Sequence, residues 1–177
     1  KARLAQLSQQ VQDMLIFSRG GVVLNSSVPV EHLLARLQQQ LDEVCDQQHA
    51  SCVVELDAMN GMVRCNEELL LSAFSNLVEN AIQACQGHGI KPVLQLGARI
   101  NDKGLLEIQL GDNGPGIPAG LQQKILEPFF TTKSTGTGLG LAVVNAIVES
   151  HGGRFSVESG ESEGALARIT LPLLKQN

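Results

Sequence analysis

The sequence contains no tryptophan, no tyrosine and only five phenylalanines. Basic residues are outnumbered, with 13 Lys and Arg against 18 Asp and Glu, so the net charge is -5. This balance argues against a general nucleic-acid binder, which needs a basic face to neutralise phosphates. One nucleotide could still bind, because a single triphosphate needs only local donors and a metal. No apolar run approaches the length of a membrane span, which predicts no membrane contact by this chain.

The four cysteines also lack a recognisable pattern. Cys45, Cys52, Cys65 and Cys85 form no C-x-x-C pair and have no histidine at the spacing of zinc ligands. We interpret them as reduced thiols in the core of a cytoplasmic protein. The chain begins at Lys1 rather than Met, which suggests a piece of a longer protein.

Length and periodicity favour one domain with a short appendage. At 43% hydrophobic residues, the 177-residue chain can bury a sizeable core. Helices are predicted at residues 1–19, 29–48, 66–86 and 138–151. Strands are predicted at residues 22–24, 51–56, 62–65, 93–100, 105–110, 154–159 and 165–172. We expect the second and third strands to form a hairpin at Asn60 and Gly61. The mixture predicts an α+β two-layer sandwich.

Two asparagines stand on the predicted third helix. Asn76 and Asn80 are spaced i, i+4, so their amides lie on one face, beside an apolar side. Such amides could bind Mg²⁺ and phosphate oxygens, since Mg²⁺ takes oxygen ligands. Taken alone, the pair is more simply explained as a polar helix face.

A second cluster follows the strand at residues 105–110. The Asp112 carboxylate could accept a hydrogen bond from an exocyclic amine such as that of adenine. Gly114 and Gly116 would let the backbone turn and approach a flat base. The alternative is an ordinary turn, because Asp, Asn and Gly are common turn residues.

Two further clusters occupy a long irregular stretch rich in Gly, Pro and Thr, which is too long for a simple connection. Phe129 and Phe130 are expected to anchor this loop to the domain, which leaves Lys133 available to phosphates. Alternatively, the phenylalanines pin the loop and the lysine is incidental. Gly136, Gly138 and Gly140 open the last helix, where free N–H groups form an anion site. The spacing matches neither a dinucleotide fingerprint nor a Walker loop.

In this order, the clusters resemble the N, G1, F and G2 boxes of the histidine-kinase branch of the GHKL ATPases. The match covers about residues 22–177. Residues 1–21 resemble the end of the second helix of a dimerisation and histidine-phosphotransfer bundle. The stretch from Phe129 to Leu141 is similar to that of nitrogen-regulatory and flagellar-regulatory sensor kinases, which usually serve activators of σ54 promoters.

The resemblance implies a Bergerat fold, a two-layer α/β sandwich with a mixed sheet backed by three helices and an ATP lid. It implies binding of ATP and Mg²⁺, with Asn80 on the metal, Asn76 close to it and Asp112 on the adenine amine. Lys133 would join the two asparagines in catalysis. The implied nucleotide contacts are Asn76, Asn80, Asp112, Gly114, Gly116, Ile117, Phe130, Thr132, Lys133, Gly136, Thr137, Gly138, Leu139 and Gly140.

The sequence departs from the family pattern in two places. Gln83 stands where many relatives carry a basic residue, which places more of the phosphate contact on Lys133. None of the four histidines precedes an acidic residue, as the acceptor histidine of the family does. We therefore expect this chain to bind ATP without phosphorylating itself. Its partners would be the histidine-bearing bundle of the same protein, a second copy in the full-length dimer, and a response regulator.

Two other functions remain possible from the sequence. An anti-σ-factor type of serine kinase shares the same ATP site, although the helix at residues 1–19 argues against it. A non-catalytic nucleotide-sensing module is the second alternative, and the complete set of Asn80, Asp112 and the three glycines argues against it.

Overall fold

The computed structural model describes residues 24–57, 60–118, 120–132, 136–159 and 164–175. The appendage at residues 1–21 and Lys133 therefore lie outside the described residues. Within these ranges, five strands form one sheet in the order β2-β4-β5-β7-β6, and β1 and β3 form a separate pair. The strands of the larger sheet are β2 (Ser51–Leu56), β4 (Val93–Ile100), β5 (Leu105–Asp112), β6 (Arg154–Ser159) and β7 (Ala165–Pro172).

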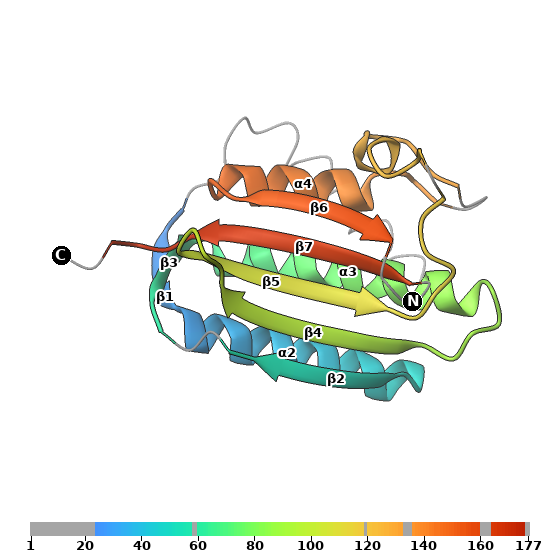
Figure 1. Ribbon diagram of the computed structural model, residues 1–177, viewed down its shortest axis with the longest axis horizontal. Helices are drawn as coiled ribbons and strands as arrows, with labels where there is room; N and C mark the ends of the chain where they lie inside the picture. Colours follow the sequence, from blue (N-terminus) through green and yellow to red (C-terminus); the bar gives the residue numbers. More distant parts are fainter. Residues whose placement is uncertain (1–23, 58–59, 119, 133–135, 160–163, 176–177) are drawn as a thin grey trace.

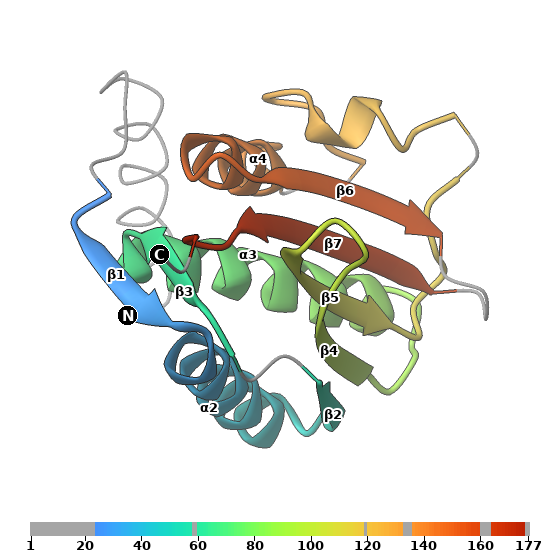
Figure 2. The same ribbon diagram turned by 60° about the vertical axis from the view of Figure 1, so that its left-hand side comes forward.

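Three helices cover one face of this sheet, namely α2 (Val30–Gln48), α3 (Glu67–Gln86) and α4 (Gly140–Ser150). Figure 1 shows them side by side behind the strands, and Figure 2 shows the two layers from the side. Leu33, Phe74 and Ile147 each present a fully buried side chain to the common core. The predicted α+β two-layer sandwich is confirmed.

The sheet is mixed because one pair of neighbours is parallel. Strand β2 runs parallel to β4, with Ser51 opposite Val93, whereas the other pairs are antiparallel. The predicted hairpin between β2 and β3 is wrong. Strand β3 (Met62–Cys65) instead pairs with β1 (Ser26–Pro29). Most of the strand expected at residues 22–24 lies outside the described residues. A parallel neighbour requires a long crossover, and β3 and α3 belong to that crossover.

Local signals set the ends of the helices. Asn66 caps α3 by accepting a hydrogen bond from the Leu69 N–H at 3.2 Å, as predicted. Helix α4 begins at Gly140 rather than at residue 138, because Gly138 has a φ of +69°, which a right-handed helix does not allow. Among the described residues, no helix is both long and apolar enough to cross a membrane. The four cysteines are free thiols, and three of them are buried.

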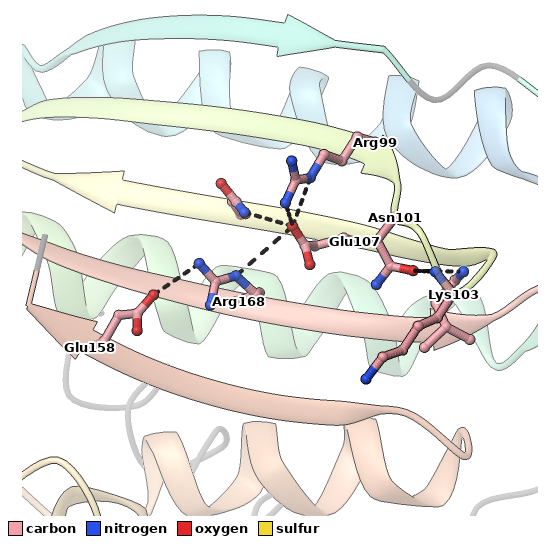
Figure 3. Close-up of polar contacts among 8 residues, drawn as sticks. Arg99, Asn101, Lys103, Glu107, Glu158 and Arg168 are labelled. Atoms are coloured by element: carbon pink, nitrogen blue, oxygen red, sulfur yellow. Dashed lines mark hydrogen bonds and ion pairs between the residues drawn. The ribbon is translucent and has the colours of Figure 1, made fainter.

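The sheet face opposite the helices carries a network of charges. Glu107 on β5 is only 6% exposed and bonds Arg99 on β4 at 2.8 Å, while Arg168 on β7 bonds Glu158 on β6 at 2.9 Å (Figure 3). Burial alone would raise the pKa of Glu107, but the Arg99 hydrogen bond and the positive charges of Arg99 and Arg168 hold this pKa below its ordinary value. The network links four neighbouring strands on the face away from the core.

A buried histidine connects the N-terminal end of α3 with the C-terminal end of α4. His151 is 2% exposed; its Nδ1 lies 2.7 Å from the Ile147 carbonyl oxygen and its Nε2 accepts the Asn66 N–H at 3.0 Å. This arrangement requires a neutral ring with its proton on Nδ1. Burial lowers the pKa of His151, although the hydrogen bond to the Ile147 carbonyl oxygen opposes that shift.

Acid should therefore destabilise the domain through His151. Because the pKa is lower in the folded state, the unfolded state takes up the proton first, and stability falls as the pH drops below about 6.5. We expect the free energy of unfolding to fall by up to about 1.4 kcal/mol per pH unit between pH 6.5 and 5.5. Urea titrations at several pH values would measure this change in the free energy of unfolding with pH. The slope should become smaller in His151→Gln and persist in His88→Gln, which changes an exposed histidine.

Candidate nucleotide site

A cavity of about 180 Å³ lies where β5 ends, between α3, α4 and the segment that follows β5. Most of its lining is apolar, and two of the lining side chains, Asn80 and Asp112, are polar and hydrogen-bonding. The lining residues are Leu77, Asn80, Ala81, Ala84, Leu110, Asp112, Gly116, Ile117, Ile125, Leu141, Val157, Ala165 and Ala167. An apolar cavity with few polar groups is typical of a site that binds a flat small molecule and fixes its orientation.

Asp112 is the last residue of β5 and is held firmly on one side. Its Oδ1 accepts the backbone N–H of Gly114 at 2.8 Å and that of Ala165 at 3.2 Å. Burial raises the pKa of Asp112, and the two N–H groups only partly oppose this shift. Within the described ranges no group donates to Oδ2. The carboxylate is thus oriented, partly desolvated and able to accept one further hydrogen bond.

The two glycines after Asp112 bring the main chain close to it. A side chain at Gly114 would place its Cβ 2.8 Å from the Asp112 Oδ1 and 3.4 Å from the Cys85 Sγ. Gly116 has a φ of +74°, which favours glycine, and it lines the cavity. Asn113, which lies between Asp112 and Gly114, is structural, since its Oδ1 accepts the Val93 N–H at 2.8 Å.

Asn80 and Asn76 sit differently on α3. Asn80 lines the cavity, whereas Asn76 is 8% exposed and stands outside the cavity lining. The Asn76 Nδ2 is buried with no hydrogen-bond partner among the described residues. A buried donor without a partner costs about 1–3 kcal/mol, so this amide is suited to a bound oxygen. Because amide oxygen and nitrogen can be exchanged by a flip, the group could equally offer its oxygen.

The donor set suits Mg²⁺ held jointly with a nucleotide. In the part of the chain that the structure describes, no three His, Cys, Asp or Glu side chains are arranged to hold a metal. Mg²⁺ often keeps several waters and takes one or two protein oxygens together with substrate phosphates. The Asn80 amide can supply such a ligand, with Asn76 near it on the same helix.

The glycine cluster leads into α4 beside Asn80. A Cβ at Gly140, the first residue of α4, would lie 3.3 Å from the Asn80 Nδ2. Leu139 is 4% exposed and donates its N–H to the Thr137 Oγ1 at 3.4 Å. The structure thus brings the predicted metal-binding helix and the predicted phosphate-binding turn together. Gly136 and Thr137 are exposed at the start of this turn.

Gly138 touches the segment that carries the two phenylalanines. The Phe129 N–H donates to the Gly138 carbonyl oxygen at 2.9 Å. A Cβ at Gly138 would lie 2.7 Å from the Phe129 oxygen and 2.7 Å from the Phe130 nitrogen. The middle of the irregular stretch is therefore joined to Gly138 through backbone atoms, and only a glycine fits at this junction.

The expectation that both phenylalanines anchor the loop is wrong for Phe129. This residue is 70% exposed and has a φ of +67°, while Phe130 is half-buried and Thr132 is exposed. Leu126 packs against the core instead, and Ile125 lines the cavity. Both belong to a short 3-10 helix, Lys124–Leu126, which lies beside α4 (Figure 1). In the sequence, the adjacent apolar residues Ile125 and Leu126 were the signal that could have indicated where this loop is anchored.

Comparisons with known proteins agree with this arrangement. Residues 65–175 match the family model described as "Histidine kinase-, DNA gyrase B-, and HSP90-like ATPase". The chain is 39% identical over 174 residues to the sensor protein kinase FleS of Pseudomonas aeruginosa, which covers 98% of this chain and 42% of FleS. The chain thus spans less than half the length of this curated relative.

Solved structures of histidine kinases share the fold. The nucleotide-free catalytic domain of histidine kinase ThkA matches with a TM-score of 0.71 and 27% identity, over 84% of this chain and 95% of that domain. ThkA in complex with the response regulator protein TrrA matches with a TM-score of 0.75 and 23% identity, over 98% of this chain and 49% of that one.

Proposed function

Because this chain belongs to the family of histidine kinase-, DNA gyrase B- and HSP90-like ATPases, we propose that it is the ATP- and Mg²⁺-binding kinase domain of a two-component sensor. In the intact protein, the γ-phosphate would pass to a histidine on the helical bundle. The observation that carries the proposal is Asp112, fixed by two backbone N–H groups in an apolar cavity with one oxygen available.

Asp112 would recognise the adenine base. Its Oδ2 can accept a hydrogen bond from the exocyclic amine, and the Gly114–Gly116 backbone lets the ring lie close. Ile117 and Leu77 would contact the flat faces of the base within the cavity. Guanine presents a carbonyl oxygen instead of the amine, so the same carboxylate would repel it.

The phosphates would extend from the base toward α4. Asn80 would ligate Mg²⁺, and the Asn76 amide would bind a metal-bound water or a phosphate oxygen. Backbone N–H groups from Gly136 to Gly140 would contact the phosphates. When bound, Mg²⁺ supplies the positive charge that offsets the phosphate charge. Thr132 and Lys133 would add donors from the lid; Lys133 lies outside the described residues, so its role remains a prediction.

The proposed partners follow from the relatives. FleS is a sensor kinase, and ThkA has been captured with a response regulator protein. We propose that the intact protein dimerises through its bundle, works in the cytoplasm and phosphorylates a response regulator. We propose that this regulator is a σ54-dependent activator, such as one that controls flagellar genes.

Asn80→Ala should remove the Mg²⁺-dependent gain in ATP affinity. Loss of one metal ligand is expected to weaken ATP binding in Mg²⁺ by about tenfold. ATP titrations with Mg²⁺ and with EDTA would measure the change. The fold should persist because Asn80 lies at the cavity surface. Unfolding seen by circular dichroism would identify Asn80 as a core residue instead.

The function itself is tested by phosphate transfer. With γ-labelled ATP and Mg²⁺, this chain should stay unlabelled, because none of its four histidines precedes an acidic residue as the family's acceptor does. His151, moreover, is buried with both ring nitrogens engaged. Adding the histidine-bearing bundle in trans should give acid-labile label on the bundle, although weakly without the covalent tether. Acid-stable label would favour the serine kinase, and ATP binding without any transfer would favour the nucleotide-sensing module.

A further inference from the structure

The segment after Gly116 is held by a side chain from a distant strand. The Ser159 hydroxyl donates to the Ile117 carbonyl oxygen at 2.9 Å and accepts the Ile117 N–H at 3.2 Å. One hydroxyl thus satisfies both backbone polar groups of a single residue. In a sheet, a neighbouring strand would supply those two bonds; β6 is an edge strand, and here its last side chain does so.

Ile117 matters because its position shapes the cavity. Ile117 lines the cavity together with Val157, which lies on the same face of β6 as Ser159. The loop that carries Ile117 follows Gly116, which has a φ of +74° and, having no side chain, restricts the backbone little. If the Ile117 backbone had no hydrogen-bond partner, this part of the cavity wall would adopt several conformations.

We infer that Ser159 is a positioning residue of the nucleotide site, which fixes the wall that faces the base by holding Ile117. This inference rests on the proposed ATP binding. The start of β7 supports the same wall a second time, because the Ala165 N–H bonds the Asp112 carboxylate. The end of the β6–β7 pair therefore positions both the base-reading carboxylate and the residue beside the base.

Gly164 leaves room for that support. A Cβ at Gly164 would collide with the Asp112 carbonyl oxygen, so β7 begins in direct contact with the main chain of Asp112. Asp112 is consequently fixed from the β7 side and Ile117 from the β6 side. Ser159 acts through its side-chain hydroxyl alone, so its part in this arrangement can be tested by a single substitution.

The test compares three variants in ATP titrations with Mg²⁺. Ser159→Ala should raise the Kd for ATP by about threefold to tenfold, the loss expected for about one net hydrogen bond. Ser159→Thr should restore the affinity, since it keeps the hydroxyl and suits a strand. Ser156→Ala is the matched control on the opposite face of β6 and should leave the Kd unchanged.

Two further measurements separate positioning from stability. Ser159 is exposed, so Ser159→Ala should leave Tm within about 2 °C of the parent chain. Hydrogen exchange of the Ile117 amide should become faster in Ser159→Ala and not in Ser159→Thr. An unchanged Kd, a failure of Ser159→Thr to restore it, or a drop in Tm that accompanies the affinity loss would each overturn the inference.

Asp112→Asn in the same titration distinguishes the inference from the function on which it rests. If Asp112→Asn weakens ATP binding and Ser159→Ala does not, only the role of Ser159 is wrong. If the parent chain binds no ATP, the proposed function fails and the role of Ser159 fails with it.

Discussion

Replacing Asp112 with asparagine is expected to weaken ATP binding by about tenfold to a hundredfold. A hydrogen bond to a charged acceptor contributes about 1.5–3 kcal/mol, and each 1.4 kcal/mol changes the affinity about tenfold. The asparagine oxygen would remain with the Gly114 and Ala165 N–H groups, because these are donors. Its NH₂ group would then point toward the adenine amine, so two donors would face each other.

Calorimetry with ATP and GTP would test this prediction. The parent chain should bind ATP well and GTP poorly, and Asp112→Asn should lose most of that difference. The fold should survive, since the substitution keeps the shape of the side chain and its two backbone bonds. Equal affinity of the parent chain for ATP and GTP would mean that Asp112 does not read the base.

Gly138→Ala is expected to weaken ATP binding by at least about thirtyfold. The left-handed φ of +69° costs an alanine about 1–2 kcal/mol. Its Cβ would also press against the Phe129–Phe130 peptide, and overpacking of this kind costs about 1–3 kcal/mol. Relief requires Gly138 to move away from the Phe129–Phe130 peptide, which would move the backbone N–H groups proposed to bind phosphates.

Gly104→Ala is the matched control for this prediction. Gly104 has nearly the same φ, +71°, in the turn between β4 and β5, and open space where a Cβ would lie. The control should therefore lose stability through the same backbone strain while its Kd for ATP stays unchanged. If both variants bound ATP like the parent chain, the lid junction would have no part in binding.

Most helices and strands could be predicted from the sequence because their signals are local. The bounds of α3 follow from the Asn66 cap and from an apolar face that includes Phe74. The pairing of β2 could not be predicted in this way. A turn-forming Asn60 and Gly61 favour a hairpin, but β2 gains a parallel partner in β4, which is distant in sequence. Local turn preference gave way to pairing within the larger sheet.

The candidate site shows the same division. Asn80, Asp112 and Gly140 could be proposed as site residues from the sequence, because the chemistry of each side chain, or the absence of one, already indicates the role. Phe129 was misjudged, because hydrophobicity alone does not reveal that its backbone takes a left-handed turn toward solvent. Ser159 carries no local signal, since its importance arises only when β6 lies beside the residue after Gly116.

The position of β7 bears on how the domain is built during synthesis. This strand follows the other described strands in the sequence, yet it lies inside the sheet, between β5 and β6. Ile108 on β5 can pair with Ile169 on β7 only after the intervening lid and α4 have been synthesised. Such long-range closure slows folding and leaves strand edges unpaired on the growing polypeptide. Because β7 also brings the Ala165 N–H to Asp112, a nascent chain cannot complete its nucleotide cavity before it completes its sheet.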